Sequence, residues 1–227
     1  MECSAKAAGC AVCEDGHILA ESYVNVPLTH SQTLLQMTEN MLKNADIPLQ
    51  SIDRFALSAG PGSFTGLRIG AAAVKGMALG AGKPCVSVPT LQALAWGAAA
   101  ASPADVVCAA MDARCGQVYA ALFEWGDGEP RPLCEDMALP VAELIAVLKK
   151  YGGRRIVFVG DGAEICYNEL TNTQNANFAL APEPFRWQRA AFVALLSERL
   201  PDISAAGLCP VYLRQPQAVR QLESKKP

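Results

Sequence analysis

The chain has 227 residues, of which 51% are hydrophobic and 18% charged, so it can bury a sizeable core and is not an intrinsically disordered protein. Its net charge is −3, which disfavours direct binding to nucleic acids because proteins that bind them usually carry a basic face. No apolar run reaches the roughly 18 uncharged residues that span a bilayer, and the first residues do not resemble a signal peptide. We therefore expect a cytoplasmic protein without a membrane segment.

Nine cysteines are scattered through the chain, and we expect them to be free thiols rather than a disulfide framework. Cys10 and Cys13 have CxxC spacing, but the segment around them is typical of a strand. Residues three apart on a strand point to opposite faces, so the two sulfurs would not converge on a metal. We therefore interpret them as small packing residues.

In the first half of the chain, hydrophobic periodicity and turn residues predict strands followed by helices. An Asp-Gly turn joins the first two strands. The expected elements are strands at 10–13 and 18–26, a helix at 30–43, a strand at 53–59, a helix at about 63–79, a strand near Ser87 and Val88, and a helix from Thr90 to about Ala100.

The second half continues the alternation of strands and helices, which predicts α/β lobes. The expected elements are strands at 106–111 and 117–123, a helix after Pro140, a strand at 155–159 and a final helix at about 187–200. We expect the lobe boundary within 98–103, which gives a first lobe of residues 1–102 and a second of 103–227. Whether the C-terminal tail crosses back to the first lobe stays open.

The expected helix at 30–43 carries two apolar stripes at helical spacing. One contains Leu35, Thr38 and Leu42, and the other contains Leu34, Met37 and Met41. Two stripes are more than one core face needs, which indicates either a partner or a helix that is covered on both sides by its own domain.

The segment GPGSFTGLRIG, from Gly60 to Gly70, follows an expected strand and opens a helix. It does not match a dinucleotide fingerprint, a Walker A loop or a nucleophile elbow. Two interpretations remain. The amides at the helix N-terminus could hold an anion, or the glycines could provide a small-residue helix surface for close packing.

This segment also carries a family resemblance, together with six other blocks that follow the family's order along the chain. The other blocks are Thr29-His30-Ser31 with Leu34-Leu35, Lys75 to Ala78, Val86 to Leu91, DARCGQVYAALFE from Asp112 to Glu124, Gly160-Asp161-Gly162, and Pro210 to Arg214. With them, the sequence resembles the TsaB (YeaZ) family.

The resemblance implies an α/β fold with two lobes of the actin-like ATPase (ASKHA) type, each a mixed sheet flanked by helices. It implies a non-catalytic subunit of the complex that forms N6-threonylcarbamoyladenosine at position 37 of tRNAs reading ANN codons. The implied partners are a TsaD-like transferase and a TsaE-like ATPase, with a homodimer when the chain is alone. No intrinsic cofactor is implied, and ATP or ADP at the partner interface stays open.

We expect the partner surface on the helix at 30–43 and the helix that follows the glycine loop, since two such helices from each partner would form a four-helix bundle. Its candidate residues are His30, Leu34, Met37, Met41, Leu67, Gly70, Ala71 and Val74.

Two enzymatic alternatives are weighed against the subunit. A stand-alone actin-like ATPase or kinase would need its own nucleotide site, and a glycoprotease-like metallopeptidase would need metal ligands. The chain has only two histidines, His17 and His30, on different expected elements, and no HExxH motif. Asp112 and Arg114 are interpreted as a salt-bridged loop, and Asp161 chiefly as a turn residue. We therefore expect no catalytic, cofactor-binding or metal-binding residue.

One departure from the family pattern concerns the N-terminus. Family members begin with an apolar strand that leads into Asp-Thr-Ser, whereas here Met1 directly precedes Glu2-Cys3-Ser4. We therefore expect the first lobe to lack a central strand, with the gap either destabilising the lobe or filled by another segment.

Overall fold

The computed structural model describes residues 1–26, 29–101, 104–171 and 177–214. In chain order the first elements are β1 (Ala8–Glu14), β2 (His17–Val24), α1 (His30–Asn44), the short 3-10 helix η1 (Leu49–Ser51), β3 (Phe55–Gly60), α2 (Phe64–Ala81), β4 (Cys85–Pro89) and α3 (Thr90–Ala101). They are followed by β5 (Val106–Arg114), β6 (Gln117–Gly126), β7 (Glu129–Pro132), β8 (Met137–Pro140), α4 (Val141–Leu148), η2 (Lys149–Tyr151), β9 (Ile156–Val159), α5 (Ala163–Thr171), β10 (Phe178–Leu180), α6 (Glu183–Arg186) and α7 (Ala190–Ser197).

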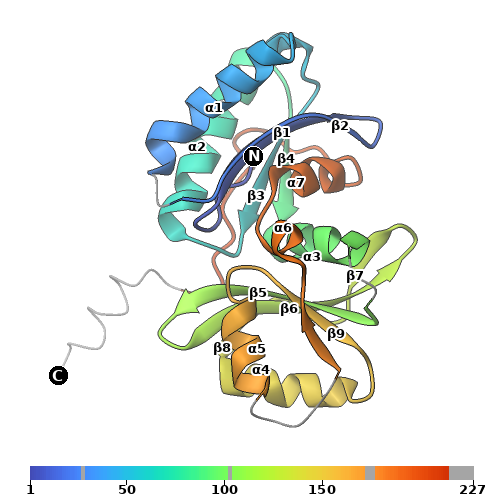
Figure 1. Ribbon diagram of the computed structural model, residues 1–227. Coiled ribbons are helices and arrows are strands. Elements are labelled where there is room, and N and C mark those ends of the chain that lie inside the picture. The colour runs from blue at the N-terminus through green and yellow to red at the C-terminus, as the bar shows by residue number, and fades with distance from the viewer. Residues whose placement is uncertain (27–28, 102–103, 172–176, 215–227) are drawn as a thin grey trace, which may run out of the picture.

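In the first lobe, the described strands form two separate pairs instead of one continuous mixed sheet. β1 and β2 form an antiparallel hairpin, and β3 pairs with β4 in parallel. Helices α1 and α2 cover one side of these strands and α7 covers the other (Figure 1). The side chains of β3 alternate between the two sides, because Phe55 and Leu57 join the core under α1 and α2 whereas Ala56 packs toward α7.

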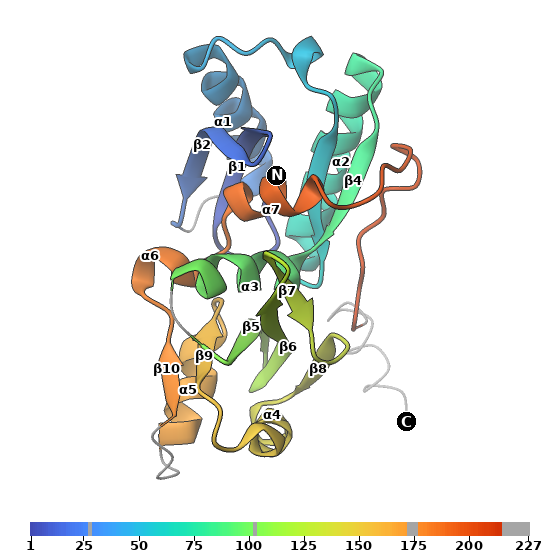
Figure 2. The same cartoon turned by 90° about the vertical axis from the view of Figure 1, so that its right-hand side faces the viewer.

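The second lobe is built on a six-stranded sheet with the order β10-β9-β5-β6-β7, in which β8 also pairs with β6. One face packs against α4 and α5 and the other against α3, which lies between the lobes (Figure 2). Strand β5 is buried on both faces, as its unbroken apolar sequence predicts. The expected lobe boundary between residues 102 and 103 lies outside the described residues and stays a prediction.

After the second sheet, the chain returns to the first lobe. Helix α7 packs on all four strands of that lobe. Beyond it, Ile203 exchanges two backbone hydrogen bonds of 2.8 Å with Cys85, and the amide of Val211 donates to the carbonyl of Ala59 at 2.7 Å. The segment that includes α7 therefore belongs to the core of the first lobe.

Most expected elements are present, with shifted ends. The final helix expected at 187–200 is shorter, because α7 ends at Ser197 and a separate turn, α6, precedes it. Strand β3 begins at Phe55 rather than at position 53, since Asp53 is exposed. All nine cysteines are free thiols, as expected. No helix in the described ranges is long and apolar enough to cross a membrane.

Candidate functional site

Helices α1 and α2 lie side by side on the first lobe (Figure 1). Ser63 caps the start of α2, because its hydroxyl accepts a hydrogen bond from the amide of Gly66 at 3.3 Å. Gly82 ends the helix in the left-handed conformation with φ +65°. Thr29 occupies the N-cap position of α1 without a side-chain cap bond. Both ends of α2 are therefore fixed by the sequence, and its 18 residues make about five turns.

Most residues that the sequence suggested for a partner surface lie inside the chain's own core. The side chains of Leu34 and Met41 are 1% and 5% exposed, and they pack with Ala71 and Val74 in the core under α1 and α2. The others are Leu67 and Gly70, which are also buried, and His30 and Met37, which are half-buried.

This placement corrects the sequence interpretation of α1. The stripe that contains Leu34 and Met41 faces the strands, and Leu35, from the other stripe, is 53% exposed. Thr38 and Leu42, of that same second stripe, are buried as well. The two stripes are thus mainly two parts of one broad buried face, because the helix is packed on the hairpin and on α2 at once.

The glycines of α2 fall into two kinds. A Cβ at Gly66 would lie 2.1 Å from the carbonyl oxygen of Cys3, and a Cβ at Gly70 would lie 2.3 Å from the sulfur of Cys3. At Gly76 and Gly80 a Cβ would meet nothing within 4 Å. The first pair therefore allows the N-terminal segment to approach the helix, and the second pair is on an open surface.

The open surface of α2 is a narrow stripe in which small residues are combined with Arg68 and Leu79. It consists of Thr65, Arg68, Ala72, Gly76, Leu79 and Gly80, all exposed. Leu79, at 72%, has the largest exposed fraction among the exposed large hydrophobic side chains of the described chain. The spacing of three and four residues keeps these positions on one side of the helix. We call this set the α2 stripe. Sequence reasoning expected a small-residue surface on this helix, which includes Gly76 and Gly80, but it chose partner residues on the buried side of the helix.

The beginning of α2 is joined to the C-terminal segment. Arg68 lies over the ring of Phe64 at 3.9 Å and donates to the hydroxyl of Tyr212 at 3.3 Å. The rings of Phe64 and Tyr212 are 4.6 Å apart. The block around Tyr212 thus holds the end of the α2 stripe in place, a role that the sequence did not assign to it.

The glycine loop is occupied by the chain itself. The amide of Ser63 donates to the carbonyl of Ser4 at 2.6 Å, and the amides of Gly66 and Leu67 both donate to Ser63. The amide of Gly60 donates to the hydroxyl of Thr90 at 3.0 Å. Because these donors are satisfied internally, the geometry favours the packing interpretation over an anion site.

The remaining candidate polar residues lie at the end of β5, directly after β9, and at the starts of β2 and α1. Arg114 forms an ion pair of 3.2 Å with Asp112, as the salt-bridged loop interpretation predicted. Asp161 accepts a hydrogen bond of 2.9 Å from Gln188, and burial raises the pKa of its carboxyl group. His17 and His30 lie on β2 and α1. Within the described part of the chain, no three His, Cys, Asp or Glu side chains are grouped to hold a metal ion.

Comparison with known proteins identifies the family. A family model described as "TsaD: tRNA N6-adenosine threonylcarbamoyltransferase" matches residues 26–218. The tRNA threonylcarbamoyladenosine biosynthesis protein TsaB of Haemophilus influenzae is 30% identical over 213 residues, which are 87% of this chain and 85% of that protein. The chain belongs to the TsaB (YeaZ) family. The TsaB of Escherichia coli is 38% identical over 124 residues, which are 55% of this chain and 53% of that protein.

The fold comparison agrees with this family. The structure of YeaZ from Pseudomonas aeruginosa superposes with a TM-score of 0.79 at 29% identity, over 93% of this chain and 97% of that one. A second structure, from an uncharacterised protein with similarity to the peptidase YeaZ, gives a TM-score of 0.80. The family resemblance is confirmed, and so is the expected two-lobed α/β fold with sheets flanked by helices.

Proposed function

We propose that this chain is a non-catalytic subunit of the assembly that forms N6-threonylcarbamoyladenosine at position 37 of tRNAs reading ANN codons. In this proposal it pairs with a TsaD-like transferase, a TsaE-like ATPase joins the pair, and the chain forms a homodimer when alone. The observation that carries the proposal is the similarity to TsaB of Haemophilus influenzae across nearly the whole of both chains. The internal occupation of the glycine loop supports a role without catalysis by the isolated chain.

The α2 stripe is the surface through which we propose that the partner binds. Small residues let two helices approach closely, and the exposed Leu79 gains most from being covered. Leu35 on α1 is another exposed apolar side chain of the first lobe, at 53%. We include no intrinsic cofactor in this proposal, and any ATP or ADP that the assembly requires binds at the partner interface.

Replacement of Gly76 by Leu tests the surface without altering the core. A side chain at this position meets nothing in the isolated chain, so the variant should fold and be slightly more stable than the parent. It should block close approach of a partner helix and weaken binding to the cognate TsaD-like protein by at least about tenfold. Isothermal titration of the two purified proteins measures this.

Ala146→Leu is the matched control, because Ala146 is an exposed position on α4 in the second lobe. It should bind like the parent. If both variants bind normally, the α2 stripe is not the interface. If the parent chain itself does not bind a TsaD-like partner, or hydrolyses Mg·ATP alone, the subunit proposal fails and the stand-alone ATPase becomes the better explanation.

A further inference from the structure

The hairpin of β6 and β7 in the second lobe lies beside α3 and below α7 of the first lobe (Figure 2). Its strands pair as far as Gly126 and Glu129, which leaves Asp127 and Gly128 as a two-residue turn. Both turn residues have positive φ, of +51° and +76°, which is the tight type I′ geometry that follows the twist of the strands. A hairpin with such a turn keeps one shape, and we call residues 125–131 the strap.

Arg199, directly after the end of α7, connects the first lobe to the strap. Its guanidinium donates at 3.4 Å to the carbonyl of Asp127 and at 3.4 Å to the carboxylate of Glu129. The same guanidinium lies over the ring of Trp96 of α3 at 5.2 Å. Trp96 in turn meets Trp125 of the strap edge to face, with the ring centroids 5.8 Å apart. Arg199 therefore contacts the strap both directly and through Trp96.

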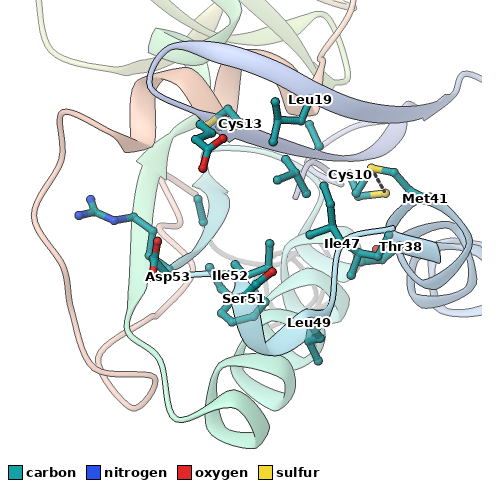
Figure 3. Close-up of a pocket in the computed structure, with 18 of the residues that line it drawn as sticks. Cys10, Cys13, Leu19, Thr38, Met41, Ile47, Leu49, Ser51, Ile52 and Asp53 are labelled. Atoms are coloured by element: carbon teal, nitrogen blue, oxygen red, sulfur yellow. Dashed lines mark hydrogen bonds between the residues drawn. The ribbon is translucent and has the colours of Figure 1, made fainter. Parts of the chain in front are cut away.

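The end of α7 is itself held in the first lobe by polar contacts. Arg54, just before β3, donates to the carbonyls of Ser197 and Leu200 at 3.3 and 3.4 Å. Glu198 accepts from the amide of Gly16, in the turn between β1 and β2, at 3.1 Å. On this side α7 borders a cavity of about 700 Å³ between the two strand pairs, which Ser197 and Glu198 help to line (Figure 3). Because close packing is incomplete there, these polar contacts set the position of the end of α7.

Helix α3 lies next to the strap and packs on both lobes. Its Leu94 joins the core on the sheet of the second lobe, whereas Ala93 packs with Val193 of α7. The side-chain amide of Gln92 donates to the carbonyl of Pro130 in the strap at 3.0 Å. A rotation of one lobe against the other must therefore displace the strap from α3 or from the end of α7.

We propose that the strap fixes the angle between the two lobes, with Arg199 as its attachment point in the first lobe. Each contact is weak by itself, because the ion pair between Arg199 and Glu129 is partly exposed to solvent. The contacts matter through their position, since they join the outer ends of elements from different lobes, where a small rotation produces the largest displacement. The strap therefore limits rotation between the lobes while adding little to the stability of either one. It acts within the chain itself, so its test requires no partner.

The test measures the distance between the lobes with two spin labels on the full chain. One label is attached at Glu39→Cys on α1 and the other at Ala146→Cys on α4, both of which are exposed positions. In every protein the exposed and half-buried cysteines are replaced by serine, so that only the two new cysteines are labelled; these are Cys13, Cys115, Cys134 and Cys209. Double electron–electron resonance then gives the distribution of distances between the labels.

Arg199→Ala detaches the strap, and Arg154→Ala is the matched control. Arg154 also forms an ion pair of 3.4 Å, with Glu124, and lies over an aromatic ring, that of Tyr151 at 6.0 Å, but all three residues belong to the second lobe. The parent and Arg154→Ala should each give one narrow distance distribution. Arg199→Ala should widen the distribution about twofold or more, because the lobes can then rotate against each other.

The proposal is overturned if Arg199→Ala leaves the distribution as narrow as that of the parent, because the lobes are then held without the strap. It is also overturned if the parent distribution is already as broad as that of the variant, since the strap would then limit nothing. Equal broadening by Arg154→Ala would overturn it as well, because the effect would come from a general loss of packing and not from the contact between the lobes.

Discussion

The sulfur of Cys3 lies where a side chain at Gly70 would begin, because a Cβ there would be only 2.3 Å from it. The same Cβ would be 2.8 Å from Leu57 of β3. Helix α2 can therefore lie against the N-terminal segment only with glycine at this position. The contact joins the family's glycine-rich segment to the first residues of the chain, and it separates glycines that the sequence alone treats alike.

Gly70→Ala should destabilise the protein, although alanine is the better helix former. The clash with Cys3 and Leu57 should lower the free energy of unfolding by about 1–3 kcal/mol. Gly76→Ala, at an open position of the same helix, should raise it by about 0.5–1 kcal/mol. Urea unfolding of the two variants measures the difference. Equal stability of the two would show that the N-terminal segment does not pack on α2.

Met41→Asp should unfold or strongly destabilise the isolated chain rather than only weaken association. Met41 is 5% exposed, and the thiol of Cys10 contacts its sulfur at 3.7 Å, so a carboxylate would be buried among apolar groups. A loss of several kcal/mol is expected from unfolding measured at low protein concentration. Leu35→Asp, at an exposed position of the same helix, should change stability by no more than about 0.5 kcal/mol. If Met41→Asp unfolds like the parent, the assignment of this stripe to the core is wrong.

Glu2→Gln should remove a part of the pH dependence of stability. Burial raises the pKa of Glu2 above its ordinary value of 4.5, and the amide and hydroxyl of Ser4 partly offset this by donating hydrogen bonds of 2.6 Å to its carboxylate. The native state therefore keeps this proton at pH values where the unfolded chain has released it. Stability from this group is present below pH 4.5 and is lost as the pH rises through the native value.

The comparison of Glu2→Gln with the parent isolates the contribution of Glu2 to the pH dependence of stability, because the amine of Met1 titrates in both proteins. The variant should gain stability relative to the parent as the pH rises from about 4 to about 8, as measured by urea unfolding at each pH. A difference that stays constant over this range contradicts the burial of an ionisable Glu2.

Glu21→Ala should weaken the packing of α7 on the β1–β2 hairpin and so lower the stability of the protein. Glu21 on β2 accepts two hydrogen bonds from Arg189, of 2.5 and 3.1 Å, and a third from the amide of Ala191 at 3.2 Å. Its removal leaves a half-buried guanidinium without its carboxylate and should lower stability by about 2 kcal/mol. Glu39→Ala, at an exposed position of α1, is the control and should have little effect on thermal unfolding. Equal effects would show that this contact is not structural.

The sequence by itself determined the family, the two-lobed α/β class and most of the elements. The family follows from the sequence blocks that occur in the family's order, and the elements follow from local signals such as the apolar run of β5 and the turn at Asp15-Gly16. The salt-bridged loop at Asp112 and Arg114 could also be predicted, because the two residues are close in the chain.

Only the tertiary structure decided which side chains are packed in the core and which are exposed to a partner. On α1, periodicity could not choose between Leu34 and Leu35, because both lie on apolar stripes and the choice depends on the strands beneath the helix. On α2, Gly70 and Gly76 have the same local chemistry, and what separates them is the approach of Cys3, which is distant in the sequence. Local patterns specify secondary structure, whereas long-range packing specifies which surfaces remain exposed for a partner.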